Sequence, residues 1–168
     1  MRESAAIACR SCLIAVLAVL FAVCSCLTAQ ASEFREGRLE ITRASGAPVV
    51  FSIEIARTLD QRLRGLSYRE RMPEKHGMLF DFEENTVMNM WMRNVSIPLD
   101  MLFIDEGGVI FRIAPDAVPF TDTVHSSRRP GRYVLCIPAG SVERLGIKRL
   151  DTVSLRAYDP VTVACPRR

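Results

Sequence analysis

Downstream of its apolar N-terminus, the chain sets an amide and a carboxylate within its most hydrophobic stretch. Residues 86–105, TVMNMWMRNVSIPLDMLFID, surround Asn94 and Asp100 with methionines, a tryptophan and aliphatic residues. An ionised carboxylate in apolar surroundings needs hydrogen-bond donors or a cation, or else it takes up a proton. Arg64 is the partner we expect for Asp100, because a guanidinium can donate two parallel hydrogen bonds to a carboxylate, and Arg93 is the second choice. Asn94 is expected to hydrogen-bond the backbone of the turn that follows it.

These polar residues have two competing interpretations. In the structural one, Arg64, Asn94 and Asp100 fasten a loop to a sheet. In the functional one, they line a cleft beside Trp91 that has an apolar floor, since polar groups that converge in an apolar pocket are typical of small-ligand sites. The candidate ligand-binding residues are Arg64, Met78, Trp91, Met92, Asn94 and Asp100. A catalytic alternative makes Asp100 the acid or base of a hydrolase or lyase that acts on envelope material.

Alternating methionines offer a different chemistry. Met88, Met90 and Met92 would project from one face of a strand, and thioethers are soft ligands that suit Cu(I). Further ligands for such a site would come from His76, His125 and Cys136. Methionine also fills irregular cores, and this packing explanation is the stronger one. No cofactor is therefore expected, and a copper-binding protein is a minor alternative.

The other polar clusters do not form a recognised catalytic motif, because the chain has neither H-E-x-x-H nor G-x-S-x-G. The carboxylates of Glu83, Glu84, Asp100 and Asp105 leave a glycosidase-like reaction as an alternative, although acidic pairs of this kind are usually solvated. The basic run HSSRRPGR, residues 125–132, is expected to be a solvated loop, with an anion site as the alternative.

The N-terminus has the three parts of a secretory signal peptide. Arg2 and Arg10 give it a basic start, residues 11–24 run apolar without a charge, and an A-x-A site ends at Ala31. A retained anchor is disfavoured, because this apolar run is short for a helix that spans a bilayer. The signal peptide is therefore expected to occupy residues 1–31.

Cleavage would leave one domain, residues 32–168, of a size that suits a single hydrophobic core. The 22 basic and 19 acidic residues become 20 and 18, so the formal charge falls from +3 to +2 and gives no reason to propose nucleic acid as a partner. We expect a periplasmic protein with no membrane span and a small ligand or envelope protein as its partner; a lipoprotein anchored at Cys26 and an extracellular protein are alternatives. Cys136 and Cys165 invite a disulfide in an oxidising compartment, although two unrelated thiols are an alternative.

Short strands dominate the predicted elements. PVVFSIEIA alternates, and its apolar face consists of Val49, Phe51, Ile53 and Ile55. Further strands are predicted in GMLFDF, PLDMLFID, VIFRI, YVLCIP and TVSLRA, with DEGG at 105–108 as a hairpin turn. Residues 32–37 and the tail from Pro160 are expected to be irregular.

The strand that follows Pro98 is predicted to be buried on both faces. Asp100 should share one face with Leu102 and Ile104. The opposite face should consist of Leu99, Met101 and Phe103. A strand that is apolar on both faces is typical of the interior of a sheet.

Two short helices accompany the strands. TLDQRLRGL has a capping box, in which Thr58 is the N-cap and Gln61 follows three residues on, and Gly65 can end the helix. AGSVERLG predicts about two turns from Ser141 to Gly146. We therefore expect a mainly-β (β-rich α+β) domain, either a compact sandwich or jelly roll or a partly closed barrel.

Four blocks of the sequence carry a resemblance to a known family. They are RGLSYR (64–69), GMLFDF (77–82), WMRNVSIPLDMLFID (91–105) and YVLCIPAGSVERLGI (133–147). In this order they resemble the DUF192 family, also called UPF0127, whose members are small bacterial and archaeal domains that are often exported. The resemblance covers residues 49–157 and implies a compact, mainly-β domain of sandwich or jelly-roll type. The family has no established biochemical activity, so the resemblance leaves the function open.

The sequence departs from the family pattern at five positions. Ser67 stands where methionine is usual, Met90 replaces an aromatic residue, Val95 replaces threonine, Cys136 replaces glutamate, and Leu150 replaces glycine. No catalytic role of that glutamate can apply here. We therefore interpret the chain as an exported binding module with a cleft near Trp91, rather than as an enzyme.

Overall fold

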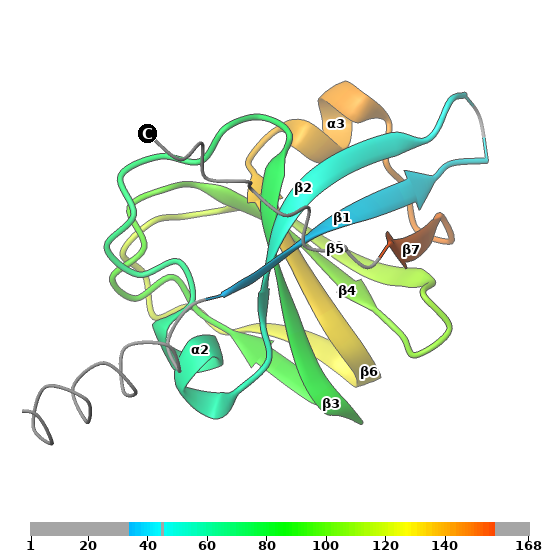
Figure 1. Cartoon of the computed structure of the whole chain (residues 1–168). Coiled ribbons are helices and arrows are strands. Elements are labelled where there is room, and N and C mark those ends of the chain that lie inside the picture. The colour runs from blue at the N-terminus through cyan, green and yellow to red at the C-terminus, as the bar shows by residue number, and fades with distance from the viewer. Residues whose placement is uncertain (1–33, 45, 157–168) are drawn as a thin grey trace, which may run out of the picture. The chain divides into compact units, whose positions relative to one another are not determined.

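The computed structural model describes residues 34–44 and 46–156, a mainly-β unit with two short helices (Figure 1). Its elements are β1 Arg35–Thr42, β2 Val49–Ala56, α2 Leu59–Arg64, β3 His76–Met90, β4 Leu99–Ile104, β5 Ile110–Ala117, β6 His125–Pro138, α3 Ser141–Leu145 and β7 Thr152–Arg156. The predicted signal peptide and the tail from Pro160 lie outside the described residues. No helix among those residues has the length and apolar character needed to cross a bilayer.

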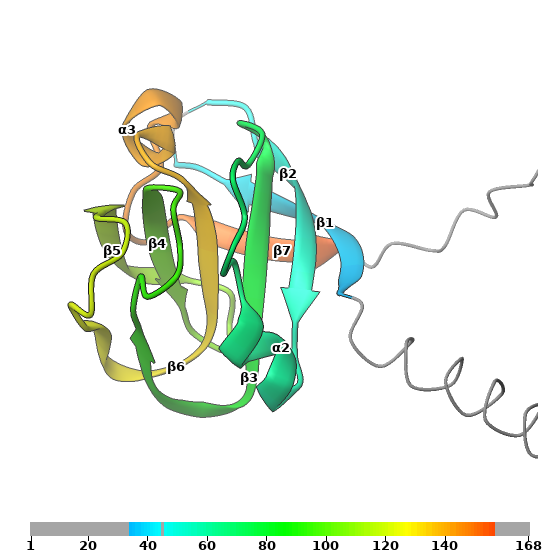
Figure 2. The ribbon, with the colours of Figure 1, turned by 90° about the vertical axis from the view of Figure 1, so that its left-hand side faces the viewer.

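One seven-stranded sheet, in the order β5-β4-β6-β3-β2-β1-β7, forms the framework. The β2–β3 pair is parallel and the other pairs are antiparallel. The sheet curls (Figure 2), and an antiparallel bridge between Val109 and Thr152 joins the start of β5 to the strand at the other edge. The mainly-β prediction is therefore confirmed, in its partly closed form.

Closure at this bridge depends on Gly108. The backbone N–H of Val153 donates to the Gly108 carbonyl over 2.7 Å. Gly108 has φ of 81°, and a Cβ added to it would lie 2.5 Å from the Val153 carbonyl oxygen. Only glycine meets both conditions without strain, so the DEGG turn joins β4 to β5 and also permits the two edges of the sheet to meet.

Alternating side chains on the strands build two separate cores. In β4, Leu99, Met101 and Phe103 belong to the first core, together with Phe80, Met92 and Cys136 from elsewhere in the chain. Leu102 and Ile104 belong to the second core, together with Leu39, Phe51 and Leu135. The prediction that this strand is buried on both faces is confirmed, because every residue from Leu99 to Ile104 is buried.

Both helices were predicted correctly from their terminal residues. The Thr58 side chain accepts a hydrogen bond from the Gln61 backbone, and the Gln61 side chain accepts in return from the Thr58 N–H over 3.1 Å. Gly146 ends α3 with φ of 64°. Short helices depend on such caps, because few internal hydrogen bonds hold them.

The sequence prediction missed the whole of β1 and the first half of β6. Residues 35–37 were expected to be irregular and no strand was predicted over residues 38–42, yet β1 runs from Arg35 to Thr42 and pairs with β2 from Arg35 opposite Ile55 to Ile41 opposite Val49. Residues 125–132 were expected to be a loop, yet they form the first half of β6, in which Val87 pairs with Pro130. The outward side chains of this half are basic, which hides the strand pattern.

Candidate functional site

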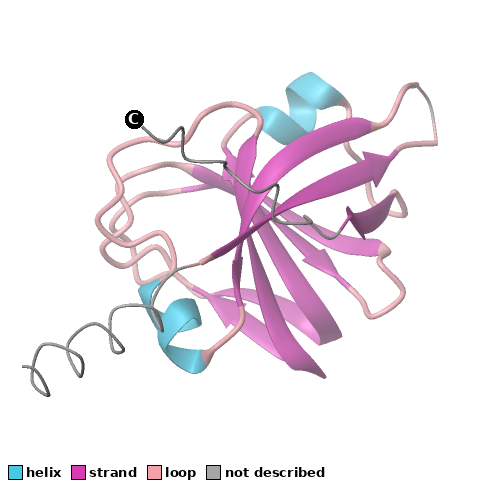
Figure 3. Ribbon diagram, in the orientation of Figure 1, coloured by secondary structure: helices cyan, strands magenta, loops and turns pink. Residues whose placement is uncertain are grey.

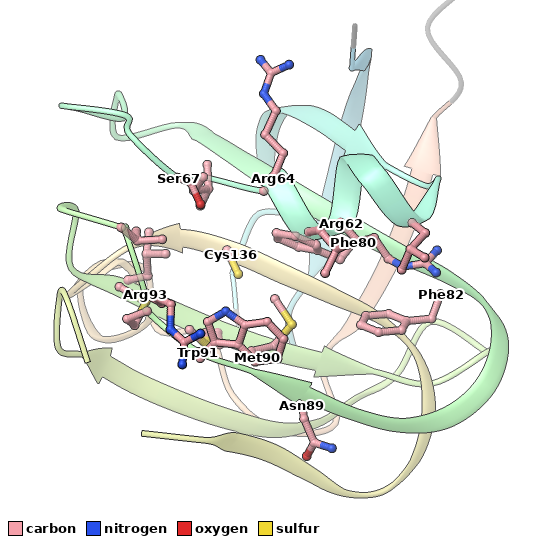
Figure 4. Close-up of a pocket in the computed structure, with 18 residues that line it drawn as sticks. Arg62, Arg64, Ser67, Phe80, Phe82, Asn89, Met90, Trp91, Arg93 and Cys136 are labelled. Atoms are coloured by element: carbon pink, nitrogen blue, oxygen red, sulfur yellow. The ribbon is translucent and has the colours of Figure 1, made fainter. Parts of the chain in front are cut away.

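A cavity of about 230 Å³ lies between α2 and the segment 89–95 (Figure 4). Its floor consists of buried side chains from the first core, namely Leu66, Phe80, Met92, Leu99, Met101 and Cys136. Exposed apolar side chains form its rim: Leu59 is 63% exposed, Leu63 59% and Trp91 47%. The floor and these rim side chains are therefore apolar.

The end of α2 is seated directly on the cavity floor. Gly65 follows the helix with φ of 45°, and a Cβ added there would lie 3.2 Å from the Phe80 ring. A larger residue would meet both the ring and an unfavourable backbone conformation. The capping box at Thr58 fixes the other end of this helix, so α2 presents Leu59 and Leu63 at the cavity rim in a defined orientation.

Loops around the cavity are fastened to one another through the backbone. The N–H of Tyr68 donates to the Asn94 carbonyl over 2.9 Å, and that of Phe120 donates to the Val95 carbonyl over 3.1 Å. Tyr68, Asn94 and Phe120 all have positive φ, between 56° and 63°. The loops gather on one side of the molecule beside α2 (Figure 3), and these bonds hold them in a backbone region that large residues rarely occupy.

Arginine supplies all the charge on the cavity lining. Arg62 Nη1 donates to the Asp81 carbonyl over 3.0 Å, and the Arg62 guanidinium lies 5.2 Å from the centre of the Phe82 ring. Arg93 Nε donates to Asp122 over 2.8 Å, and this hydrogen bond raises the pKa of Arg93. Within the part of the chain that the structure describes, the lining includes no aspartate, glutamate, lysine or histidine.

Cys136 is the one lining residue with a titratable thiol. Burial raises its pKa to about 12, so the thiol is protonated at neutral pH and is a poor nucleophile. Cys136 is a free cysteine in the structure. Its predicted partner, Cys165, lies outside the described residues, so the disulfide stays a prediction.

The predicted ligand-binding residues divide into two groups. Arg64, Trp91 and Met92 line the cavity, although the Arg64 side chain points away from it (Figure 4) and its guanidinium lies 5.0 Å from the Phe34 ring centre. Met78 is fully buried in the first core and is absent from the lining. Asn94 and Asp100 are also absent from the lining.

Asp100 is completely buried, at 0% exposure, and arginine is not its partner. Its Oδ1 accepts from the backbone N–H of Asp116 over 3.0 Å, and its Oδ2 accepts from that of Val142 over 2.9 Å. The expected Arg64 pairing was wrong because the alternation of β4 turns Asp100 away from the face that bears the cavity. This arrangement matches the structural interpretation, in which the carboxylate fastens neighbouring elements to the sheet.

Asn94 acts through its backbone. It is exposed, has φ of 58°, and lies in a turn in which the Val95 N–H donates to the Met92 carbonyl over 3.1 Å. The predicted side-chain hydrogen bond is absent from the described residues. Asparagine is favoured here because it tolerates the left-handed conformation better than most other residues.

The methionines pack as core residues. Met88 and Met92 are fully buried in the first core, and Met90 packs against it. Within the described part of the chain, no group of three or more His, Cys, Asp or Glu side chains is placed to hold a metal ion.

Sequence reasoning missed Leu59, Leu63 and Phe80 as site residues. The capping residues of α2 were recognised in the sequence, but the helix was not connected with the site. Of the five departures from the family pattern, Ser67, Met90, Val95 and Cys136 all line the cavity, and Leu150 does not. These four positions were a signal in the sequence that could have located the cavity.

Fold and cavity together define a class: a small, partly closed β domain with an apolar cavity beside a capped helix. The family model DUF192, described as "Uncharacterized ACR", matches residues 40–155. The chain belongs to the DUF192 family, as the four sequence blocks predicted. A search of the curated proteins found no match.

Two solved structures are similar to this chain. One is a protein from Sinorhizobium meliloti, provisionally described as a transcription regulator; it is 41% identical, with a TM-score of 0.72, and the match covers 73% of this chain and 95% of that one. The other is a protein of unknown function from Novosphingobium aromaticivorans; it is 35% identical, with a TM-score of 0.70, and the match covers 72% of this chain and 86% of that one.

Proposed function

We propose that this protein is an exported binding module whose cavity beside α2 holds an apolar group of its ligand. The observation that carries this proposal is the chemistry of the described lining, which combines apolar side chains with Arg62 and Arg93 and includes neither a carboxylate nor an imidazole. Such a lining can exclude water from an apolar group and orient a polar one at the rim. It offers no general acid or base for catalysis at neutral pH.

The volume sets the size of the group that fits. An engineered apolar cavity of about 150 Å³ binds benzene, and this cavity measures about 230 Å³. It therefore suits a single aromatic ring or a short aliphatic chain rather than a whole lipid. Sites for drug-sized ligands are larger, at about 300–1,000 Å³.

The enzyme alternative has less support. Asp100, its proposed acid or base, is sealed from solvent, and both of its oxygens accept backbone hydrogen bonds. The Cys136 thiol faces the cavity, but its raised pKa of about 12 leaves it protonated. The copper alternative has less support as well, because Met88 and Met92 are packed in the core.

Export is proposed from the N-terminal sequence, in which a basic start, an apolar run and an A-x-A site end at Ala31. Expression of the full chain in a bacterial host tests it. We expect the mature protein in the periplasmic fraction with Ser32 as its first residue. A protein that keeps residues 1–31 in the cytoplasm would contradict export.

The binding proposal is tested with toluene and 1-octanol. Trp91 is the only tryptophan of the chain and lies at the cavity rim, so its fluorescence emission reports binding directly. A probe at a hundred times its dissociation constant should stabilise the fold by about 2.7 kcal/mol.

A variant that narrows the cavity provides the control. Ser67→Leu extends an apolar side chain from a lining position, and we expect it to weaken the binding of both probes. Ser154→Leu changes an exposed serine outside the lining and should leave the binding of both probes unchanged. The proposal fails if neither probe alters the Trp91 emission or the melting temperature.

A further inference from the structure

The exposed apolar rim of the cavity indicates a ligand that is larger than the cavity itself. Leu59 and Leu63 line the cavity from α2. Trp91 lies on the segment across the cavity from this helix (Figure 4). A small molecule enclosed in about 230 Å³ would leave these three side chains in water, about half exposed or more. Only an occupant that extends over the rim removes this apolar surface from solvent.

The lining has the composition of the centre of a protein interface. Interface centres are enriched in aromatic residues, methionine and arginine, and depleted in lysine and acidic residues. Among the described residues, the lining includes three aromatic residues, three methionines and the side chains of Arg62 and Arg93, and it has no lysine, aspartate or glutamate. A tryptophan and arginines around an apolar depression are also typical of binding hot spots.

The charges on the lining all have one sign. Arg62 and Arg93 flank the cavity. Arg62 Nη1 donates to the carbonyls of Arg57 and Asp81, and Arg93 Nε donates to Asp122, so only some of the five N–H donors of each guanidinium are engaged. Asp122 is the acidic neighbour of Arg93, but their side chains are 71% and 66% exposed, and ion pairs this exposed contribute little. An occupant with carboxylates beside its apolar group would complement this rim.

The site is also preorganised. The capping box holds α2, and the loops with Tyr68, Asn94 and Phe120 are joined by backbone hydrogen bonds. A rigid surface loses little conformational entropy when a partner binds.

We infer that this face is a docking site for a partner protein, whose acidic segment inserts one aromatic or leucine-sized side chain into the cavity. The inference rests on the proposed function, because it assigns the occupant of the same cavity. A bilayer surface would not need an enclosed cavity of this size. A polysaccharide would need more hydrogen-bonding groups than the lining offers, since its uncharged polar side chains are those of Ser67 and Asn89.

Three blocked pentapeptides test the inference on the full chain, with Trp91 emission as the readout. The first is acetyl-EEFEE-amide, the second replaces its phenylalanine with alanine, and the third replaces its glutamates with lysine. We expect saturable binding of the first, and binding at least about tenfold weaker for the second, because loss of an anchor side chain removes most of the affinity. The lysine peptide should also bind less tightly than the first peptide. Added salt should reduce the difference in affinity between the lysine peptide and the first peptide.

Matched variants confirm the place of binding. Leu63→Glu puts a negative charge at the rim and should abolish binding of the acidic peptide. Leu150→Glu makes the same change at a leucine that is 75% exposed and lies outside the lining, and it should leave binding unchanged. Circular dichroism checks that both variants are folded.

The possible outcomes separate the two proposals. Peptides that all bind equally, or an acidic peptide that binds Leu63→Glu as well as the native chain, would overturn the docking inference. If toluene binds while the peptides do not, the cavity still holds small apolar groups and only the inference on the partner fails. If the chain binds lipid vesicles but not the peptides, a membrane is the occupant and the inference is wrong.

Discussion

The Asp100 carboxylate in β4 accepts a hydrogen bond from the backbone N–H of Val142, 2.9 Å away, in the first turn of α3. Its other oxygen accepts from the N–H of Asp116 over 3.0 Å, where β5 has an irregular register opposite β4. The N-cap of α3, Gly140, has no side chain with which to cap this helix. A buried carboxylate from the sheet takes over that role and joins three elements.

Replacement of Asp100 should therefore affect stability. Asp100→Asn keeps the shape but puts an amide NH₂ in place of one acceptor, so one of the two backbone N–H groups loses its partner. We expect a loss of about 1–3 kcal/mol in the free energy of unfolding, measured in urea. Asp122→Asn breaks only an exposed pair and should cost less than about 1 kcal/mol. Equal effects of the two variants would exclude this role of Asp100.

Closure of the sheet should depend on Gly108 and not on its neighbour. Gly108→Ala places a Cβ 2.5 Å from the Val153 carbonyl oxygen at a φ of 81°, and a left-handed backbone alone costs an ordinary residue about 1–2 kcal/mol. Gly107→Ala meets no atom closer than 3.5 Å. The melting temperature should fall clearly for the first variant and little for the second. A hydrogen-exchange experiment should show the loss of protection concentrated in β7.

Stability should fall at alkaline pH because of Cys136. Burial raises the pKa of this thiol from 9.0 to about 12. Below pH 9 the thiol is protonated in both the folded and the unfolded chain, so it has no effect there. Between pH 9 and 12 the unfolded chain releases the proton and the folded chain keeps it. The free energy of unfolding therefore falls by about 1.4 kcal/mol for each pH unit.

A comparison of pH slopes isolates this effect from other groups that titrate in the same range. The free energy of unfolding is measured in urea from pH 8 to 10.5 for the native chain and for Cys136→Ala. The variant is expected to be less stable at pH 8, because it leaves a small void in the core, but its stability should decline less steeply. Identical slopes would show that Cys136 ionises equally well in both states.

The turn at Asn94 should accept glycine and reject branched residues. At φ of 58°, Asn94→Val should cost about 1–2 kcal/mol, whereas Asn94→Gly should be close to neutral. The same pair of variants also tests the role of this turn at the cavity, because Trp91 precedes it. Asn94→Val should weaken toluene binding and Asn94→Gly should retain it; the reverse order would contradict a backbone role.

Local features were predictable because short-range physics decides them. The capping box of Thr58 and Gln61 and the DEGG turn appeared where the sequence placed them. The alternation in β4 also held, and it separated Leu102 and Ile104 from the other face of the strand. Each of these features depends on residues within a few positions of one another.

The sequence by itself determined the helix caps, the alternation of β4 and the presence of a carboxylate that must find donors. Only the tertiary structure decided which donors those are. The N–H groups of Asp116 and Val142 lie 16 and 42 positions from Asp100, and no local pattern encodes which backbone groups the curl of the sheet brings to it. The alternation of β4 turns Asp100 away from the face that bears the cavity, so the polar cluster and the apolar cavity are two separate features on opposite faces of one strand.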